Sequence, residues 1–192
     1  MATEIKIPMM SFPSAAEWER WLAENQGAAG GIWMQLAKKG SGITTVTYDE
    51  ALDVALCYGW IDGQKKSLDA DYFLQKFTPR RKKSLWSKRN VTKAQELIEA
   101  GRMQAAGLAE VEAAREDGRW EAAYDLARDM TVPEDFVRAV GQDEKAAAFF
   151  ATLNKTNLYA IAWRLQTART PETRARRFAG LLEMVKKGEK LH

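Results

Sequence analysis

Histidine and cysteine are nearly absent from this chain of 192 residues, and each absence excludes a class of site. The only histidine is His192, so a Ser-His-Asp or Cys-His arrangement lacks its base and histidine-ligated zinc or iron lacks its ligands. The only cysteine, Cys57, excludes an internal disulfide and multi-cysteine metal sites. Because Cys57 lies in an apolar helical pattern, we expect a buried, inert thiol. The sequence thus predicts no metal, no cofactor and no identifiable catalytic residue.

Long apolar runs are absent as well. No stretch approaches the roughly 18 apolar residues that a membrane-spanning helix needs. The first residues, MATEIKIPMMSFPS, have neither the basic start nor the apolar centre of a secretion signal. The composition, 46% apolar and 29% charged, is typical of a globular protein in water. We therefore expect no membrane span and a cytoplasmic location.

The hydrophobic pattern predicts an α+β fold that is predominantly helical. Capping boxes at residues 14–17 and 47–50 predict two helices, and apolar alternation predicts strands over 32–37, 60–66 and 72–78. From residue 92 onward the pattern is helical, in segments at 92–100, 105–116, 119–129, 133–140, 143–153, 156–168 and 171–187. We expect a small antiparallel β-sheet in the N-terminal half, packed with a C-terminal helical bundle. The predicted parts are an α/β part over residues 1–92, with a basic loop, and a helical part over 93–192, packed as one unit.

Positive charge is concentrated in one segment. Between Gln64 and Lys93 there are ten Lys or Arg and two Asp, a net charge of +8 in a chain whose total is +3. Such concentration indicates an anionic partner, for which nucleic acid, an acidic protein and lipid headgroups are the candidates. A second positive region lies near the C-terminus, at Arg169, Arg174, Arg176 and Arg177.

The basic segment combines cations with an aromatic ring, as a backbone-phosphate site with an adjacent stacking surface does. Trp86 would stack on the ligand or anchor the loop; the alternative is a solvated basic loop with Trp86 turned into the core. The cations predicted to contact phosphate or carboxylate oxygens are Arg80, Arg81, Lys82, Lys83, Lys88 and Arg89.

A second hypothesis is an enzyme acting on a small anionic molecule in a cleft near Trp60 and Asp62. Carboxylates close together can perform acid–base chemistry, and Asp49, Glu50 and Asp53 are near in sequence. Two other roles compete: first-turn residues stabilise a helix through its dipole, and Asp62 could pair with an arginine. A pocket that joins Asp62 to Arg80 or Arg81 would favour the enzyme.

A third hypothesis is a protein–protein interaction module. It requires large apolar side chains at the surface, and Trp86 and Trp120 are the candidates. Exposure of both rings would favour it.

Six motifs together resemble one bacterial family. They are ALCYGWIDGQ (55–64), FTPRRKKSLWSKRN (77–90), AGRM (100–103), GRW (118–120), VPEDF (132–136) and PETRARR (171–177). From about Trp18 to Gly188 the chain is similar to the YdeI/OmpD-associated family, also labelled bacteriocin-protection proteins. The resemblance implies a role in stress or bacteriocin resistance, association with an outer-membrane porin and a periplasmic location, and it supplies no catalytic residues. The sequence itself favours a cytoplasmic, non-enzymatic protein that binds an anionic partner, and it leaves the oligomeric state open.

Overall fold

The structure is a computed structural model of the chain that describes residues 7–28, 30–126 and 129–192. Its contacts divide the chain into two compact units. Unit 1 comprises residues 1–86 and 90–122, and unit 2 comprises residues 87–89 and 123–192. The division into parts at residue 92 stays a prediction; contacts group the helices up to residue 122 with the sheet.

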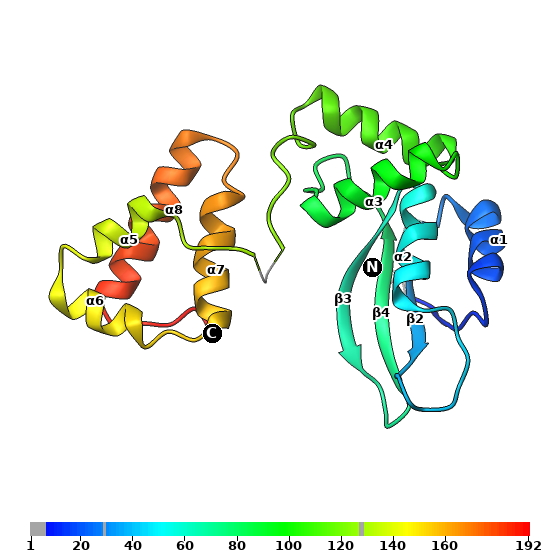
Figure 1. The fold of residues 1–192 in the computed structure, drawn as a ribbon, viewed down its shortest axis with the longest axis horizontal. Coiled ribbons are helices and arrows are strands. Elements are labelled where there is room, and N and C mark those ends of the chain that lie inside the picture. The colour runs from blue at the N-terminus through cyan, green and yellow to red at the C-terminus, as the bar shows by residue number, and fades with distance from the viewer. Residues whose placement is uncertain (1–6, 29, 127–128) are drawn as a thin grey trace, which may run out of the picture. The chain divides into compact units, whose positions relative to one another are not determined.

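Unit 1 is built on a four-stranded sheet in the order β1-β2-β4-β3. Figure 1 labels three of these strands, with β4 between β2 and β3. Strand β2 (Ile32–Ala37) pairs antiparallel with β4 (Tyr72–Pro79), which pairs antiparallel with β3 (Trp60–Ser67). The short β1 (Met9–Met10) runs parallel to β2, so the sheet is mixed. The predicted α+β class is confirmed, and the three predicted strands are present.

Helices α1 (Ala15–Asn25) and α2 (Tyr48–Cys57) begin where the capping boxes predicted. At α2 the box is complete: Thr47 Oγ1 accepts the Glu50 amide, and the Glu50 carboxylate accepts the Thr47 amide. The helices are joined by a bond from Trp18 Nε1 to the carbonyl of Ala51 at 3.0 Å. This hydrogen bond satisfies the only polar atom of the buried Trp18 ring, so the ring can pack in the core without an unpaired donor.

Helices α3 (Lys88–Glu99) and α4 (Ala105–Glu116) follow the sheet. Gly107 of α4 lies against the backbone end of α2: a Cβ added there would stand 2.3 Å from the carbonyl oxygen of Cys57. Only glycine allows so close an approach. Its role is therefore to let α4 pack on α2.

Unit 2 is helical, with α5 (Glu134–Val140), α6 (Glu144–Ala151), α7 (Lys155–Gln166) and α8 (Pro171–Lys186). Its core includes Phe136, Ile161, Leu181 and Val185. The helix predicted over residues 119–129 is wrong for the described residues of that range, which form turns and an isolated bridge from Tyr124 to Ser87. Residues 127 and 128 of that prediction lie outside the described chain.

Candidate functional site

The loop between β4 and α3 carries the centre of the basic segment, and a buried arginine–tryptophan pair fixes it. Arg80 is 7% exposed, and its guanidinium carbon lies 3.5 Å from the ring centroid of Trp86. Arg80 also donates from Nη1 to the carbonyl of Leu85 and from its amide to the carbonyl of Gly59. Arg80 therefore ties the start of the loop to its end.

A second buried arginine holds the same loop from the end of α4. Arg119 donates from Nη1 to the carbonyl of Ser84 at 3.0 Å, and its Nε pairs with the Asp117 carboxylate at 2.6 Å. Within the loop, the Arg81 amide donates to Ser84 Oγ and the Ser84 amide donates to the carbonyl of Arg81. These bonds close a tight turn over residues 81–84.

The side chains of that turn face solvent. Arg81, Lys82 and Lys83 are all exposed, in contrast to Arg80 immediately before them. We call these three residues the loop cations. A partner can reach these three cations without displacing core side chains.

Other cations of the segment have interaction partners. Lys88 pairs with Asp125 at 2.5 Å, and Lys93 pairs with Asp53 at 2.6 Å. Three further lysines lie over aromatic rings, Lys65 over Phe73 and both Lys66 and Lys76 over Trp33. Arg89 is partly buried and has an interaction partner.

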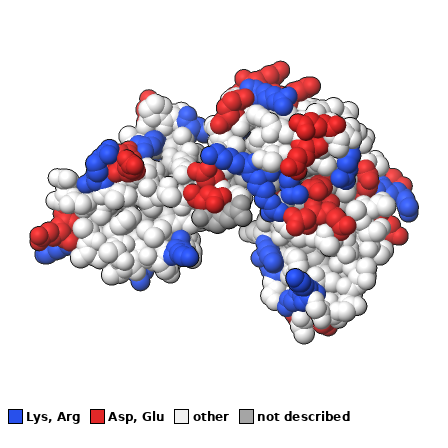
Figure 2. Space-filling model, viewed as in Figure 1, with Lys and Arg blue, Asp and Glu red and all other residues white. Residues whose placement is uncertain are grey.

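Acidic side chains also lie close to the loop. Lys82 lines a cavity of about 480 Å³ together with Glu110, Glu116, Asp117 and Arg119. Figure 2 shows both signs of charge side by side over this region of unit 1. The surface is thus less positive than the sequence count of +8 indicates.

Trp86 and Trp120 are core residues. They are 2% and 8% exposed, and their ring centroids lie 4.8 Å apart in an edge-to-face arrangement. Trp86 therefore anchors the loop from inside. The exposure of both rings that would favour a protein-interaction module is not found.

The second predicted site separates into two places. Asp62 accepts a hydrogen bond of 2.7 Å from the hydroxyl of Tyr48. Trp60 is 1% exposed and lines, with Arg80 and Glu110, a cavity of about 360 Å³ whose described lining does not include Asp62. No described pocket joins Asp62 to Arg80, so the observation that would favour an enzyme at this site is not found.

Two of the four C-terminal arginines are engaged within unit 2. Arg174 pairs with Asp135 at 2.8 Å, and the hydrogen bond to this guanidinium holds the pKa of the Asp135 carboxyl below its ordinary value. Arg177 donates to the carbonyl of Arg164 at 2.8 Å. These two side chains therefore brace helices α5, α7 and α8.

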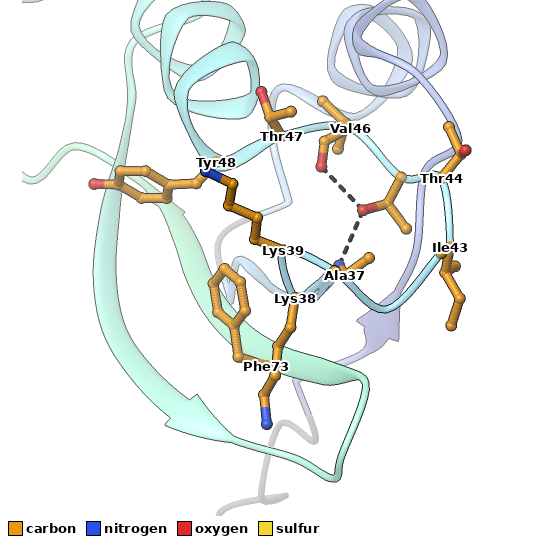
Figure 3. Close-up of a pocket in the computed structure, with 12 residues that line it drawn as sticks. Ala37, Lys38, Lys39, Ile43, Thr44, Val46, Thr47, Tyr48 and Phe73 are labelled. Carbon is orange, nitrogen blue, oxygen red and sulfur yellow. Dashed lines mark hydrogen bonds between the residues drawn. The ribbon is translucent and has the colours of Figure 1, made fainter.

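One further cavity was not predicted from the sequence. It lies beside the end of β2 and the loop that leads to α2, and Figure 3 shows Lys38, Lys39, Tyr48 and Phe73 around it. The sequence carries a signal for it, a lysine pair directly before the glycine-containing turn at residues 40–42. Nothing in the sequence indicates that Phe73, far along the chain, completes the wall.

Within the described ranges there is no cluster of three or more His, Cys, Asp or Glu that could hold a metal ion. No helix among these residues is long and apolar enough to span a membrane.

The fold and the basic loop define this chain as an α+β protein with a sheet-bearing unit and a helical unit. Residues 10–110 match the family model described as a domain of unknown function (DUF8412), and because that match covers more than half of the chain, the chain belongs to this family. Residues 129–188 match the model described as "Bacteriocin-protection, YdeI or OmpD-Associated". This match confirms the resemblance predicted from the motifs, over the part that holds VPEDF and PETRARR. No curated protein and no solved structure matches the chain.

Proposed function

We propose that this protein binds an anionic partner through the loop cations Arg81, Lys82 and Lys83. The observation that carries the proposal is the contrast between Arg80, stacked on buried Trp86, and the three exposed cations that follow it on a closed turn. Holding the cations on a fixed loop lowers the entropy lost on binding.

Two further observations support the loop as the contact surface. The turn is braced from both sides, by Arg80 and by Arg119, so its geometry does not depend on the cations that it presents. Lys88 and Arg89, also predicted to contact the partner, follow this loop at the start of α3. Their present partners would have to be exchanged for the ligand, so we assign them a secondary role.

The test compares charge reversal at the loop with a matched reversal elsewhere. The loop variant is Arg81→Glu, Lys82→Glu and Lys83→Glu, and the control is Arg20→Glu, Arg102→Glu and Lys155→Glu, at exposed positions with the same change in net charge. Fluorescence anisotropy at low salt measures binding of labelled duplex DNA, single-stranded DNA and RNA, and polyglutamate; sedimentation measures binding to anionic vesicles.

We expect the wild-type protein to bind at least one of these anions and the loop variant to bind it at least about tenfold more weakly, because both attraction and counterion release are lost. The control should lose much less. The partner class is the one with which wild-type binding is tightest. Equal losses in the two variants, or no binding to any of the anions, would contradict the proposal.

The biological setting is part of the proposal. The match to the bacteriocin-protection family supports a protective role under stress, in which the loop would engage its anionic target. The cytoplasmic location expected from the sequence also stays a proposal, and cell fractionation tests it.

A further inference from the structure

A second cationic region in unit 1 lies around the end of β2 and the start of β4. Two neighbouring cavities, of about 540 and 360 Å³, share Lys38, Lys39 and Phe73 in their walls. Volumes of this size are typical of sites for small molecules and cofactors. The larger cavity is shown in Figure 3, where the Phe73 ring lies between the side chains of the two lysines.

The charged residues that line these two cavities have one sign. Lys38 and Lys39 line both, and Lys65 lines the smaller one; every charged side chain in their described lining is a lysine. The cavities near Arg80 and Lys82 differ, since both include glutamate. Among these four cavities, the two lined by lysines therefore suit a compact anion best.

Two hydrogen bonds from backbone amides fix the walls, so the backbone that carries Lys38 and Lys39 has a defined position. The Lys38 amide donates to the carbonyl of Asp71 at 2.6 Å, and Thr45 Oγ1 accepts the amide of Ala37 at 3.0 Å. The first bond ties the end of β2 to the β3–β4 turn, and the second ties β2 to the loop before α2.

The side chains at the wall supply both cationic and aromatic contacts. Lys38 Nζ donates to the carbonyl of Asp69, which leaves two of its three N–H groups for another acceptor. Lys65 Nζ lies 4.1 Å from the centroid of the Phe73 ring, so an ammonium group and an aromatic face adjoin. This combination matches a ligand that has an anionic group attached to a planar ring.

We propose that this cavity binds a small phosphorylated molecule with a planar ring, of which a nucleoside monophosphate is the simplest probe. Lys38, Lys39 and Lys65 hold the phosphate, and Phe73 contacts the ring. The site is separate from the loop cations and does not depend on the function proposed for them.

The test uses AMP, adenosine and inorganic phosphate, titrated into the full-length protein at low ionic strength. Isothermal titration calorimetry measures affinity, and amide chemical-shift changes locate the site. The variant is Lys39→Glu with Lys65→Glu, both exposed, and the charge-matched control is Lys145→Glu with Lys155→Glu in unit 2.

We expect AMP to bind with millimolar or tighter affinity and to shift the amides of Lys39 and Phe73. The cavity variant should weaken AMP binding at least about tenfold, and the control by less than about twofold. Phosphate should bind more weakly than AMP, and adenosine should not bind measurably.

Three results would overturn this assignment: no binding of AMP at millimolar concentration, equal affinity for adenosine and AMP, or an unchanged affinity in the cavity variant. The loop variant, Arg81→Glu with Lys82→Glu and Lys83→Glu, separates the two proposals. It should keep its affinity for AMP while losing the anionic partner, and loss of AMP affinity in it would place AMP at the loop.

Discussion

Arg80 shows at the scale of one residue how a partner decides the role of a charge. In sequence it belongs to a run of four cations, but in the structure it stacks on Trp86 and is buried, whereas Arg81 is exposed. Sequence counts charges and cannot tell which guanidinium finds an aromatic partner in the core. The position of the basic loop could be predicted from the sequence. Which of its cations is buried and which are exposed could not.

This difference in burial predicts effects of different size on stability for two neighbouring substitutions. Arg80→Ala should lower the free energy of unfolding of unit 1 by about 2–3 kcal/mol, because it removes a hydrogen bond from a charged donor and the packing on Trp86. Arg81→Ala should change it by less than about 0.5 kcal/mol. Urea unfolding followed by tryptophan fluorescence measures both; equal losses would mean that Arg80 does not hold the loop.

The thiol of Cys57 predicts a dependence of stability on alkaline pH. Burial raises its pKa from 9.0 to about 11. As the pH rises above 9, the unfolded state loses this proton first, so the folded state becomes less stable relative to the unfolded one until the pH reaches about 11.

The Cys57→Ala variant isolates that contribution from the other groups that titrate in this range. Between pH 8 and 10.5, the wild type should lose about 2 kcal/mol of unfolding free energy more than the variant does. Urea unfolding at the two pH values measures the difference. A difference that stays constant would show that the thiol is not buried as described.

At the scale of elements, the sequence predicted helices and strands best where interactions between neighbouring residues determine them. The capping box at Thr47 and Glu50 fixed the start of α2, and apolar alternation fixed β2. The helix predicted from the sequence over residues 119–129 was wrong, because the described residues of that range form turns and an isolated bridge. Trp120 and Tyr124 there are positioned by distant partners, Trp86 and Ser87, which a local pattern cannot show.

The contact between α2 and α4 gives a prediction that reverses the usual preference for alanine in helices. Gly107→Ala should destabilise the protein by about 1–3 kcal/mol, because its Cβ would overlap the Cys57 carbonyl. Gly180→Ala, at an exposed position of α8 where a Cβ meets nothing within 4 Å, should stabilise by about 0.5–1 kcal/mol. Thermal unfolding by circular dichroism compares the two, and stabilisation by both would refute the close packing.

At the scale of the whole molecule, the structure redistributes the charge that the sequence concentrates. Of the cations between residues 64 and 93, two pair with aspartates, three lie over Trp33 or Phe73, and Arg80 is buried. The loop cations stay exposed, and a cavity lined by lysines appears at the other end of the sheet. The anionic nature of the partner stays a prediction from the sequence, and the sequence could not show which of these cations remain exposed.

The salt dependence of binding tests the central claim most directly. For duplex DNA, each phosphate contact contributes about 0.9 to the slope of log K against log salt concentration. Replacing Arg81, Lys82 and Lys83 by alanine should therefore reduce the slope by about 2–3 and weaken binding at low salt. A slope and an affinity equal to those of the wild type would contradict a role of the loop cations in anion binding.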